Sequence, residues 1–103
     1  MIHAVTFRIH YDDTYDQRYD TTIAAITGAA EGVKSWWGEP TSFYLVRSSK
    51  SPVELADHVI ANSKFSASKD LILVVNTSGK QGHALHGHYE DKDVLTLLGE
   101  RSK

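Results

Sequence analysis

A group of aspartates is the first feature of this sequence that could do chemistry. The residues follow an apolar segment and are Asp12, Asp13, Asp16 and Asp20. A magnesium or calcium site would need several of these carboxylates to converge on one point. Beside the first turns of a helix, the same carboxylates would instead favour the positive end of the helix dipole, by about 0.3–1 kcal/mol each. We favour this structural interpretation and keep divalent-metal-dependent cleavage of RNA or DNA by Asp12 or Asp13 as an alternative.

Histidines form a second candidate set towards the end of the chain. If residues 83–89 form a strand, His86 and His88 share one face and His83 lies on the other. A zinc or nickel site would need a further ligand, and the sequence places none beside this pair. We therefore predict exposed histidines on an edge strand, no metal site and no cofactor. Because imidazoles gain positive charge below about pH 6.5, we expect any anion binding by the chain to depend on pH.

Basic and aromatic side chains supply a third set. Proteins that bind nucleic acid contact phosphates with cationic side chains and stack bases on aromatic rings. The predicted phosphate contacts are Arg8, His10, Arg18 and Arg47. The predicted dimer interface consists of Trp36, Trp37 and Tyr44. Two adjacent tryptophans on a strand point to opposite faces, so at least one of them leaves the core, and an interface accounts for this.

Length and composition limit the class of protein. The chain has 103 residues, which we assign to one domain over residues 1–103. Apolar residues make up 41% and charged residues 23%, which is typical of a globular protein rather than a disordered one. The absence of cysteine excludes disulfides, thiolate zinc sites and cysteine nucleophiles. The sequence also has no nucleophile-elbow motif and no phosphate-binding glycine loop, and we assign no catalytic residue.

Charge and hydropathy narrow the candidate partners. A formal net charge of −2 removes the long-range field that dominates non-specific binding to nucleic acid, so such binding would need a local basic patch. No apolar run approaches the length of about 18 residues that a membrane span needs, and no charged-then-apolar leader begins the chain. We therefore expect a cytoplasmic protein that does not bind membranes.

The spacing of apolar residues predicts the elements of the first half. Residues 2–10 alternate like a strand that is buried on one face. Thr14 and Gln17 have the spacing of a capping box, and the helical pattern that follows extends over about residues 15–32. Val33 would end the apolar stripe of this helix. Two short apolar runs then flank a glycine and a proline, which indicates a hairpin.

The second half begins with a clear helix signal. Ser51, Pro52 and Glu54 have the spacing of an N-cap, a first-turn proline and a capping box. The nearly continuous apolar run over residues 70–77 predicts a central strand that is covered on both faces or pressed into a dimer.

A turn and two weaker elements complete the chain. Residues 78–82 predict a turn, and residues 83–89 predict a strand at the edge of the sheet because Gly87 weakens it. A short helix would then be capped by Asp91 and ended by Gly99.

The order of these elements predicts the fold. Strand, helix, strand, strand, helix, strand is the order of the split βαβ unit. We therefore predict an α+β, ferredoxin-like βαββαβ sandwich with an antiparallel sheet and an additional C-terminal strand and short helix. Both main helices would cover one face of the sheet and leave the other for a second subunit. That partly polar free face would carry Thr6, Arg8, His10, Tyr44 and Val46.

Three stretches that span most of the chain also carry a family resemblance: "AVTFRIHYDDTYDQRYDTTIAAI", "SWWGEPTSFYLVRSSKSPVELADHV" and "DLILVVNT". In them the chain resembles small SinR-like proteins, which are similar to the ferredoxin-like second CRISPR-associated adaptation protein. The resemblance implies a dimer of ferredoxin-like domains. The family's nuclease members carry an aspartate at the end of the first strand, where two subunits would hold a divalent metal. Arg8 stands at that place here, and an arginine offers no oxygen ligand.

We therefore expect a small homodimer that binds nucleic acid or serves as an assembly module, without efficient catalysis. The metal-dependent endonuclease is the first alternative. A regulator that pairs a free strand edge with a partner protein is the second.

Overall fold

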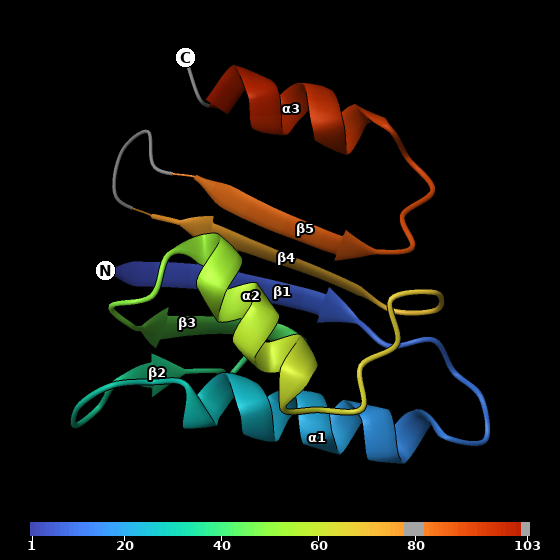
Figure 1. Cartoon of the computed structure of the whole chain (residues 1–103), viewed down its shortest axis with the longest axis horizontal. Helices are drawn as coiled ribbons and strands as arrows, with labels where there is room; N and C mark the ends of the chain where they lie inside the picture. Colours follow the sequence, from blue (N-terminus) through green and yellow to red (C-terminus); the bar gives the residue numbers. More distant parts are fainter. Residues whose placement is uncertain (78–81, 102–103) are drawn as a thin grey trace.

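The computed structural model of the chain describes residues 1–77 and 82–101 and is a mixed α+β domain (Figure 1). Its helices are α1 (Tyr15–Gly28), α2 (Pro52–Ala61) and α3 (Asp93–Arg101). Its strands are β1 (Ile2–Arg8), β2 (Trp36–Trp37), β3 (Phe43–Arg47), β4 (Leu71–Asn76) and β5 (His83–Gly87). The turn predicted over residues 78–82 falls mainly on residues 78–81, which lie outside the described part. Among the described helices, none has the length and apolar character that crossing a membrane would require.

The strands form one antiparallel sheet in the order β2-β3-β1-β4-β5. β1 lies at its centre, where Val5 is opposite Tyr44 of β3 and Val74 of β4. The prediction of an α+β fold with an antiparallel sheet is confirmed. The nearly continuous apolar run predicted over residues 70–77 forms β4, which lies between β1 and β5.

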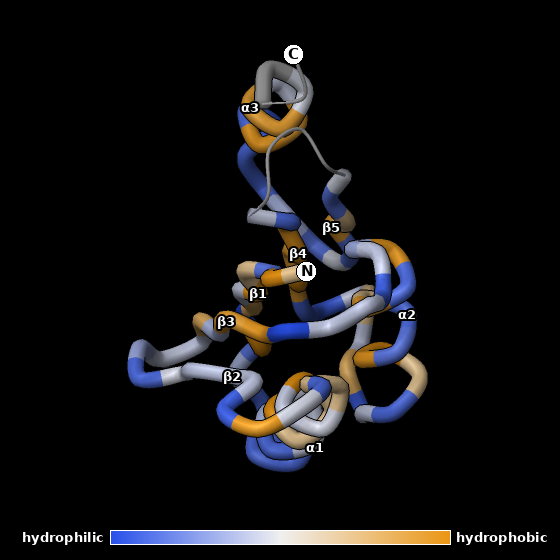
Figure 2. The backbone as a smooth tube through the Cα atoms, turned by 90° about the vertical axis from the view of Figure 1, so that its left-hand side faces the viewer, coloured by the Kyte–Doolittle hydropathy of each residue, from blue (hydrophilic) through white to orange (hydrophobic). Residues whose placement is uncertain are grey.

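Helices α1 and α2 cover the same face of the sheet, while α3 lies apart from them beside β5 (Figure 2). The core forms between this face and the two helices. Val5, Val46 and Val74 are completely buried there, and so are Ile26 of α1 and Leu55 of α2. Alternate residues of each strand and every third or fourth residue of each helix meet in one layer, because those are the periods of their side chains.

The start of α2 agrees with its sequence signal. The Ser51 hydroxyl accepts a hydrogen bond from the Glu54 amide at 3.1 Å, and the Glu54 carboxylate accepts one from the Ser51 amide at 2.9 Å. Pro52 occupies the first turn, where its missing N–H costs nothing. The capping box is therefore confirmed, and it lowers the pKa of Glu54 through the Ser51 amide and hydroxyl.

Helix α1 begins at Tyr15 as predicted, but its end and its N-terminal cap differ from the prediction. It stops at Gly28, and the chain turns at Gly32 with φ +96°, which a right-handed helix cannot accommodate. Val33 is 85% exposed, so its predicted place in the apolar stripe is wrong. The predicted capping box at Thr14 is also wrong, because the Thr14 hydroxyl donates to the Asp12 carboxylate and makes no cap bond to the helix.

The last two elements differ from their predicted lengths. β5 ends at Gly87, whose φ is +107° and whose added Cβ would lie 1.8 Å from the Asp70 carbonyl oxygen. A glycine is required at this close approach. The Asp91 carboxylate accepts from the Asp93 amide at 2.9 Å, as expected of a cap. Helix α3 continues past Gly99 instead of ending there, since a glycine costs a helix only about 1 kcal/mol.

The face of the sheet that α1 and α2 leave uncovered is more apolar than predicted. Leu45, Leu73 and Leu85 are half-buried on it, beside the exposed Thr6 and Arg8. Tyr44 and Val46 were predicted on this face but point into the core. The strand register explains the error, because Val5 pairs with Tyr44 and both residues therefore point to the covered side.

Candidate anion-binding site at the end of the central strand

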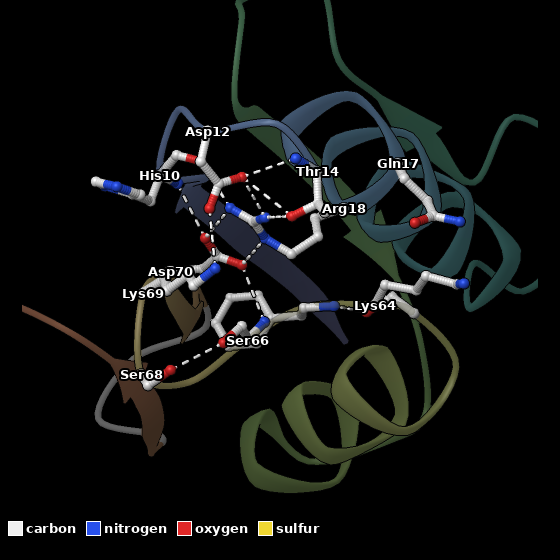
Figure 3. A network of polar contacts seen from close by, with 12 residues as sticks. His10, Asp12, Thr14, Gln17, Arg18, Lys64, Ser66, Ser68, Lys69 and Asp70 are labelled. Atoms are coloured by element: carbon white, nitrogen blue, oxygen red, sulfur yellow. Dashed lines mark hydrogen bonds and ion pairs between the residues drawn. The ribbon is translucent and has the colours of Figure 1, made fainter.

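Asp70, directly before β4, organises the polar end of the molecule (Figure 3). Its side chain is completely buried. One carboxylate oxygen, Oδ1, accepts from the His10 amide at 2.9 Å. The other, Oδ2, accepts from the Ser66 amide at 2.9 Å and from Arg18 Nε at 3.1 Å. A buried carboxylate needs such partners, because an unpaired charge in the protein interior is strongly unfavourable.

Arg18 of α1 is the cationic partner of Asp70 and is itself only 4% exposed. Its Nη1 donates to Asp12 Oδ1 at 2.7 Å, and its Nη2 donates to the His10 carbonyl at 2.6 Å. The neighbouring Asp70 and Asp12 carboxylates raise the pKa of Arg18 above its ordinary value. Arg18 was predicted to contact phosphate, but the structure places its guanidinium inside the protein, where it joins α1 to the start of β4.

Asp12 lies at the outer side of this pair. Its Oδ1 accepts from Arg18 and from the Thr14 amide, and its Oδ2 accepts from Lys69 Nζ at 2.9 Å. Hydrogen bonds from Arg18 and then Lys69 hold the pKa of Asp12 well below its usual range. Within residues 1–77 and 82–99, no three metal-ligating side chains come together. Asp12 therefore acts as a structural anion here, and Asp13 beside it is exposed.

The backbone of Asp70 holds the end of β5 as well. Its carbonyl oxygen accepts from the His88 amide at 2.8 Å, a contact that only Gly87 permits. The His88 carbonyl in turn accepts from Arg8 Nη2 at 2.8 Å. Three distant parts of the chain, namely the ends of β1 and β5 and the loop before β4, thus meet at one residue.

A hollow of about 460 Å³ opens at this meeting point, and we call it the anion hollow. Cationic and titratable side chains dominate its lining: Arg8, His10, Lys69 and His88. Glu90 is the opposing charge, with an Oε1 that lies 3.8 Å from His88 Nε2. Two permanent cations and two imidazoles around an open hollow are suited to a phosphate or another oxyanion, which can accept several charge-assisted hydrogen bonds.

The other predicted site residues lie elsewhere. Arg47 is exposed, pairs with Ile2 at the opposite end of β1, and donates weakly to the Val33 carbonyl at 3.4 Å. It does not line the anion hollow. Of the four predicted phosphate contacts, the structure brings Arg8 and His10 together in the lining of the anion hollow. Arg18 is hydrogen-bonded to the His10 carbonyl but is buried and does not line the hollow, and Arg47 lies at the opposite end of β1.

The predicted interface residues also divide. Trp37 pairs with Leu45 on the uncovered face, and 43% of it is exposed. Trp36 lies on the covered side, where its ring packs on Tyr44 with centroids 5.9 Å apart. Tyr44 is buried in the core and stacks near Phe7, which leaves it no surface for a partner.

The histidines of β5 do not form a common site. His86 lies on the helix side, with its Nε2 4.0 Å from Asp57 Oδ1. His83 is opposite Val75 on the uncovered side. His88 follows the strand and joins the anion hollow instead, because Gly87 turns the chain and breaks the alternation on which the predicted shared face depended.

Sequence reasoning missed Asp70, Lys69 and His88 as members of this site. One signal was available. Arg18 occupies the buried side of α1 together with Thr22, Ala25 and Ile26, at helical spacing. A charged residue at a core position of a helix requires a buried partner of opposite charge.

Comparison with known proteins adds no relative: no protein-family model, no curated protein and no solved structure matches the chain.

Proposed function

We propose that the chain is a small homodimeric nucleic-acid-binding or assembly module with a ferredoxin-like core and without efficient catalysis. The order β2-β3-β1-β4, antiparallel throughout and covered by α1 and α2 on one face, supports this fold. β5 and α3 are additions at one edge. The apolar uncovered face, with Trp37 and Leu45, supports contact with a second copy.

The observation that carries the binding function is the anion hollow. It concentrates Arg8 and Lys69 with two histidines at one end of a domain whose net charge is −2. The attraction is therefore local, and a phosphate backbone is the ligand that matches it best. We expect moderate affinity that falls steeply as salt is added, since each neutralised phosphate releases counterions.

Metal-dependent cleavage ranks below binding. Both carboxylate oxygens of Asp12 already accept hydrogen bonds from cationic side chains, Arg18 and Lys69. A metal ion at this place would have to displace both. Arg8 lines the same hollow as Lys69, and this further positive charge on the Lys69 side opposes a divalent cation.

Binding and cleavage of labelled single- and double-stranded DNA and RNA test the proposal. The assays contain magnesium, manganese or a chelator, at two salt concentrations. We expect binding without metal-dependent cleavage, weaker binding by Arg8→Ala, and a salt slope that is smaller by about one in this variant. Arg47→Ala is the matched control, because it removes the same charge from an exposed arginine outside the hollow.

Two outcomes would contradict the proposal. If no nucleic acid binds, the binding function is wrong and the uncovered face points to a protein partner. If metal-dependent cleavage occurs and is lost in Asp12→Ala or Asp13→Ala, the endonuclease alternative replaces it.

A further inference from the structure

The anion hollow adjoins a second hollow of different chemistry. This apolar hollow, of about 380 Å³, lies on the uncovered face of the sheet, and the connection from β5 to α3 contributes to its lining. Its lining includes Leu71, Leu73, Leu85 and Val94. Arg8 and Glu90 line both hollows, so these two side chains form the boundary between them.

The boundary is held in place by the same contacts that build the anion hollow. Arg8 donates to the His88 carbonyl, which directs its guanidinium towards the end of β5. The residues that follow His88, from Tyr89 to Asp91, line the apolar hollow. A ligand that fills both hollows would therefore contact Arg8 in the middle, with an anionic group on one side and an apolar surface on the other.

We propose that the two hollows together hold one unstacked nucleotide of a single strand. The phosphate lies in the anion hollow, and the base enters the apolar hollow, where its faces contact leucine side chains and Tyr89. This inference rests on the proposed function and names the part of the nucleic acid that is recognised. A base inside a duplex is stacked on both sides and cannot enter such a hollow, so the arrangement selects single-stranded ligands.

Charges at the rim of the apolar hollow set the direction of the ligand. Glu90 and Asp91 stand there, and both are exposed carboxylates. Asp91 lines only the apolar hollow and repels a phosphate from it, while Lys69 lines only the anion hollow and attracts one; Glu90 borders both hollows and does not distinguish between them. The two carboxylates can also accept hydrogen bonds from the amino groups of cytosine, adenine and guanine. We therefore expect bases with an amino group to bind more tightly than uracil or thymine.

The rim also argues against an anionic amphiphile such as a fatty acid. A hydrocarbon tail gains nothing from two carboxylates beside it, and their desolvation would be unfavourable. Because an anionic amphiphile is nevertheless the other ligand that combines a charged group with an apolar part, the test includes decanoate as the competing occupant.

The experiment measures affinities for cytidine monophosphate, uridine monophosphate, inorganic phosphate, decanoate, and a labelled single strand and its duplex. The first variant is Val94→Trp, which fills the apolar hollow from α3. Its control is Val53→Trp, because Val53 is a half-exposed valine on α2 outside both hollows. We expect Val94→Trp to lower single-strand affinity about tenfold, which is the effect of losing one base contact. Phosphate binding should stay unchanged, and Val53→Trp should behave as the unmodified protein does.

A measurement on the unmodified protein keeps the inference testable even if Val94→Trp does not fold. In NMR titrations of the unmodified protein, cytidine monophosphate should shift the amide signals of Leu85 and Val94 as well as those of Lys69 and His88. Inorganic phosphate should shift only the latter pair.

Several results would overturn the inference while leaving the proposed function intact: duplex affinity equal to single-strand affinity, shifts confined to the anion hollow, or unchanged binding by a folded Val94→Trp. Displacement of the single strand by decanoate but not by cytidine monophosphate would also overturn it, in favour of the amphiphile. If the unmodified protein binds no nucleic acid at all, the proposed function itself is overturned instead.

Discussion

The two ends of the central strand β1 both bury a polar side chain, and they stabilise it in different ways. At the Arg8 end, the Asp70 carboxylate is ion-paired with Arg18 and accepts backbone hydrogen bonds from His10 and Ser66. At the other end, His3 is completely buried and its Nε2 donates to the Lys50 carbonyl at 2.8 Å. Its Nδ1 has no hydrogen-bond partner among the described residues.

The two residues therefore hold the structure together in different ways: Asp70 is a charged anchor, and His3 is a neutral one. Asp70 holds three segments together through its ion pair with Arg18 and its hydrogen bonds to the His10 and Ser66 amides, and those segments carry the side chains of the anion hollow. His3 is stable only while it is uncharged, because burial lowers its pKa and a proton on Nδ1 would be a buried donor without an acceptor. The end that carries the anion hollow is therefore stabilised by an ion pair, whereas the opposite end is stable only while His3 is neutral.

Removal of the charged anchor should have the largest effect. Asp70→Ala leaves Arg18 Nε without its acceptor and the buried guanidinium with only the partly exposed Asp12 carboxylate as its ion-pair partner, and breaking a buried pair typically costs about 3–5 kcal/mol of unfolding free energy. Urea denaturation measures the loss. Asp13→Ala is the control, because Asp13 is exposed and its loss should change stability by less than about 0.5 kcal/mol.

A double variant sharpens this prediction. Arg18→Leu added to Asp70→Ala removes the stranded charge, so we expect much of the stability to return. Phosphate affinity should stay low, since the His10 amide has lost the carboxylate that holds it beside His88. A stability of Asp70→Ala close to that of the unmodified protein would show that the pair is not the anchor.

The neutral end should respond to pH. Because the pKa of folded His3 is lowered, the unfolded chain takes up a proton first as the pH falls below the ordinary value of 6.5. Stability should therefore decrease between about pH 7.5 and pH 5. In His3→Leu this part of the decrease should vanish, although the variant should be about 1 kcal/mol less stable at the higher pH because the Lys50 carbonyl loses its donor.

His10→Gln is the control for His3, because it removes an exposed histidine and should leave the decrease in place. An unchanged decrease in His3→Leu would assign the effect to another group.

Local signals in the sequence were sufficient for much of the fold. The capping box at Ser51 involves residues three apart, and the alternation of β1 placed Val5 in the core and Arg8 on the free side. The same reasoning correctly separated the two tryptophans onto opposite faces. Each of these features depends on neighbours along the chain, which the sequence displays directly.

The site depends on contacts that the sequence does not display. Arg18 and Asp70 are 52 residues apart, and no sequence pattern near either residue indicates that the two are in contact. Lys69 and His88 lie outside regular strands, so their positions follow from the Asp70 contacts and not from any period. Tyr44 was misplaced because the register between β1 and β3 is also a long-range property.

The smallest effect we predict concerns the outer member of the charged end. Because Arg18 and Lys69 lower the pKa of folded Asp12, its ionised form stabilises the protein at neutral pH. This contribution is present above the ordinary value of 3.8 and is lost as the pH falls through the folded pKa below it. Asp12→Asn should therefore be slightly less stable than the unmodified protein at about pH 7, and the difference should shrink in stronger acid.

Urea midpoints at about pH 7, 4 and 2.5 measure this difference, with Asp13→Asn as a control that should show none. A difference that persists unchanged in strong acid would mean that the substitution acts through the geometry of the hydrogen bonds at Asp12, such as the one from the Thr14 amide, and not through the lost charge. In that case the charged end would contain only the Arg18–Asp70 pair. A difference that closes would instead make Asp12 a second anion of that end, one that keeps Lys69 oriented beside the anion hollow.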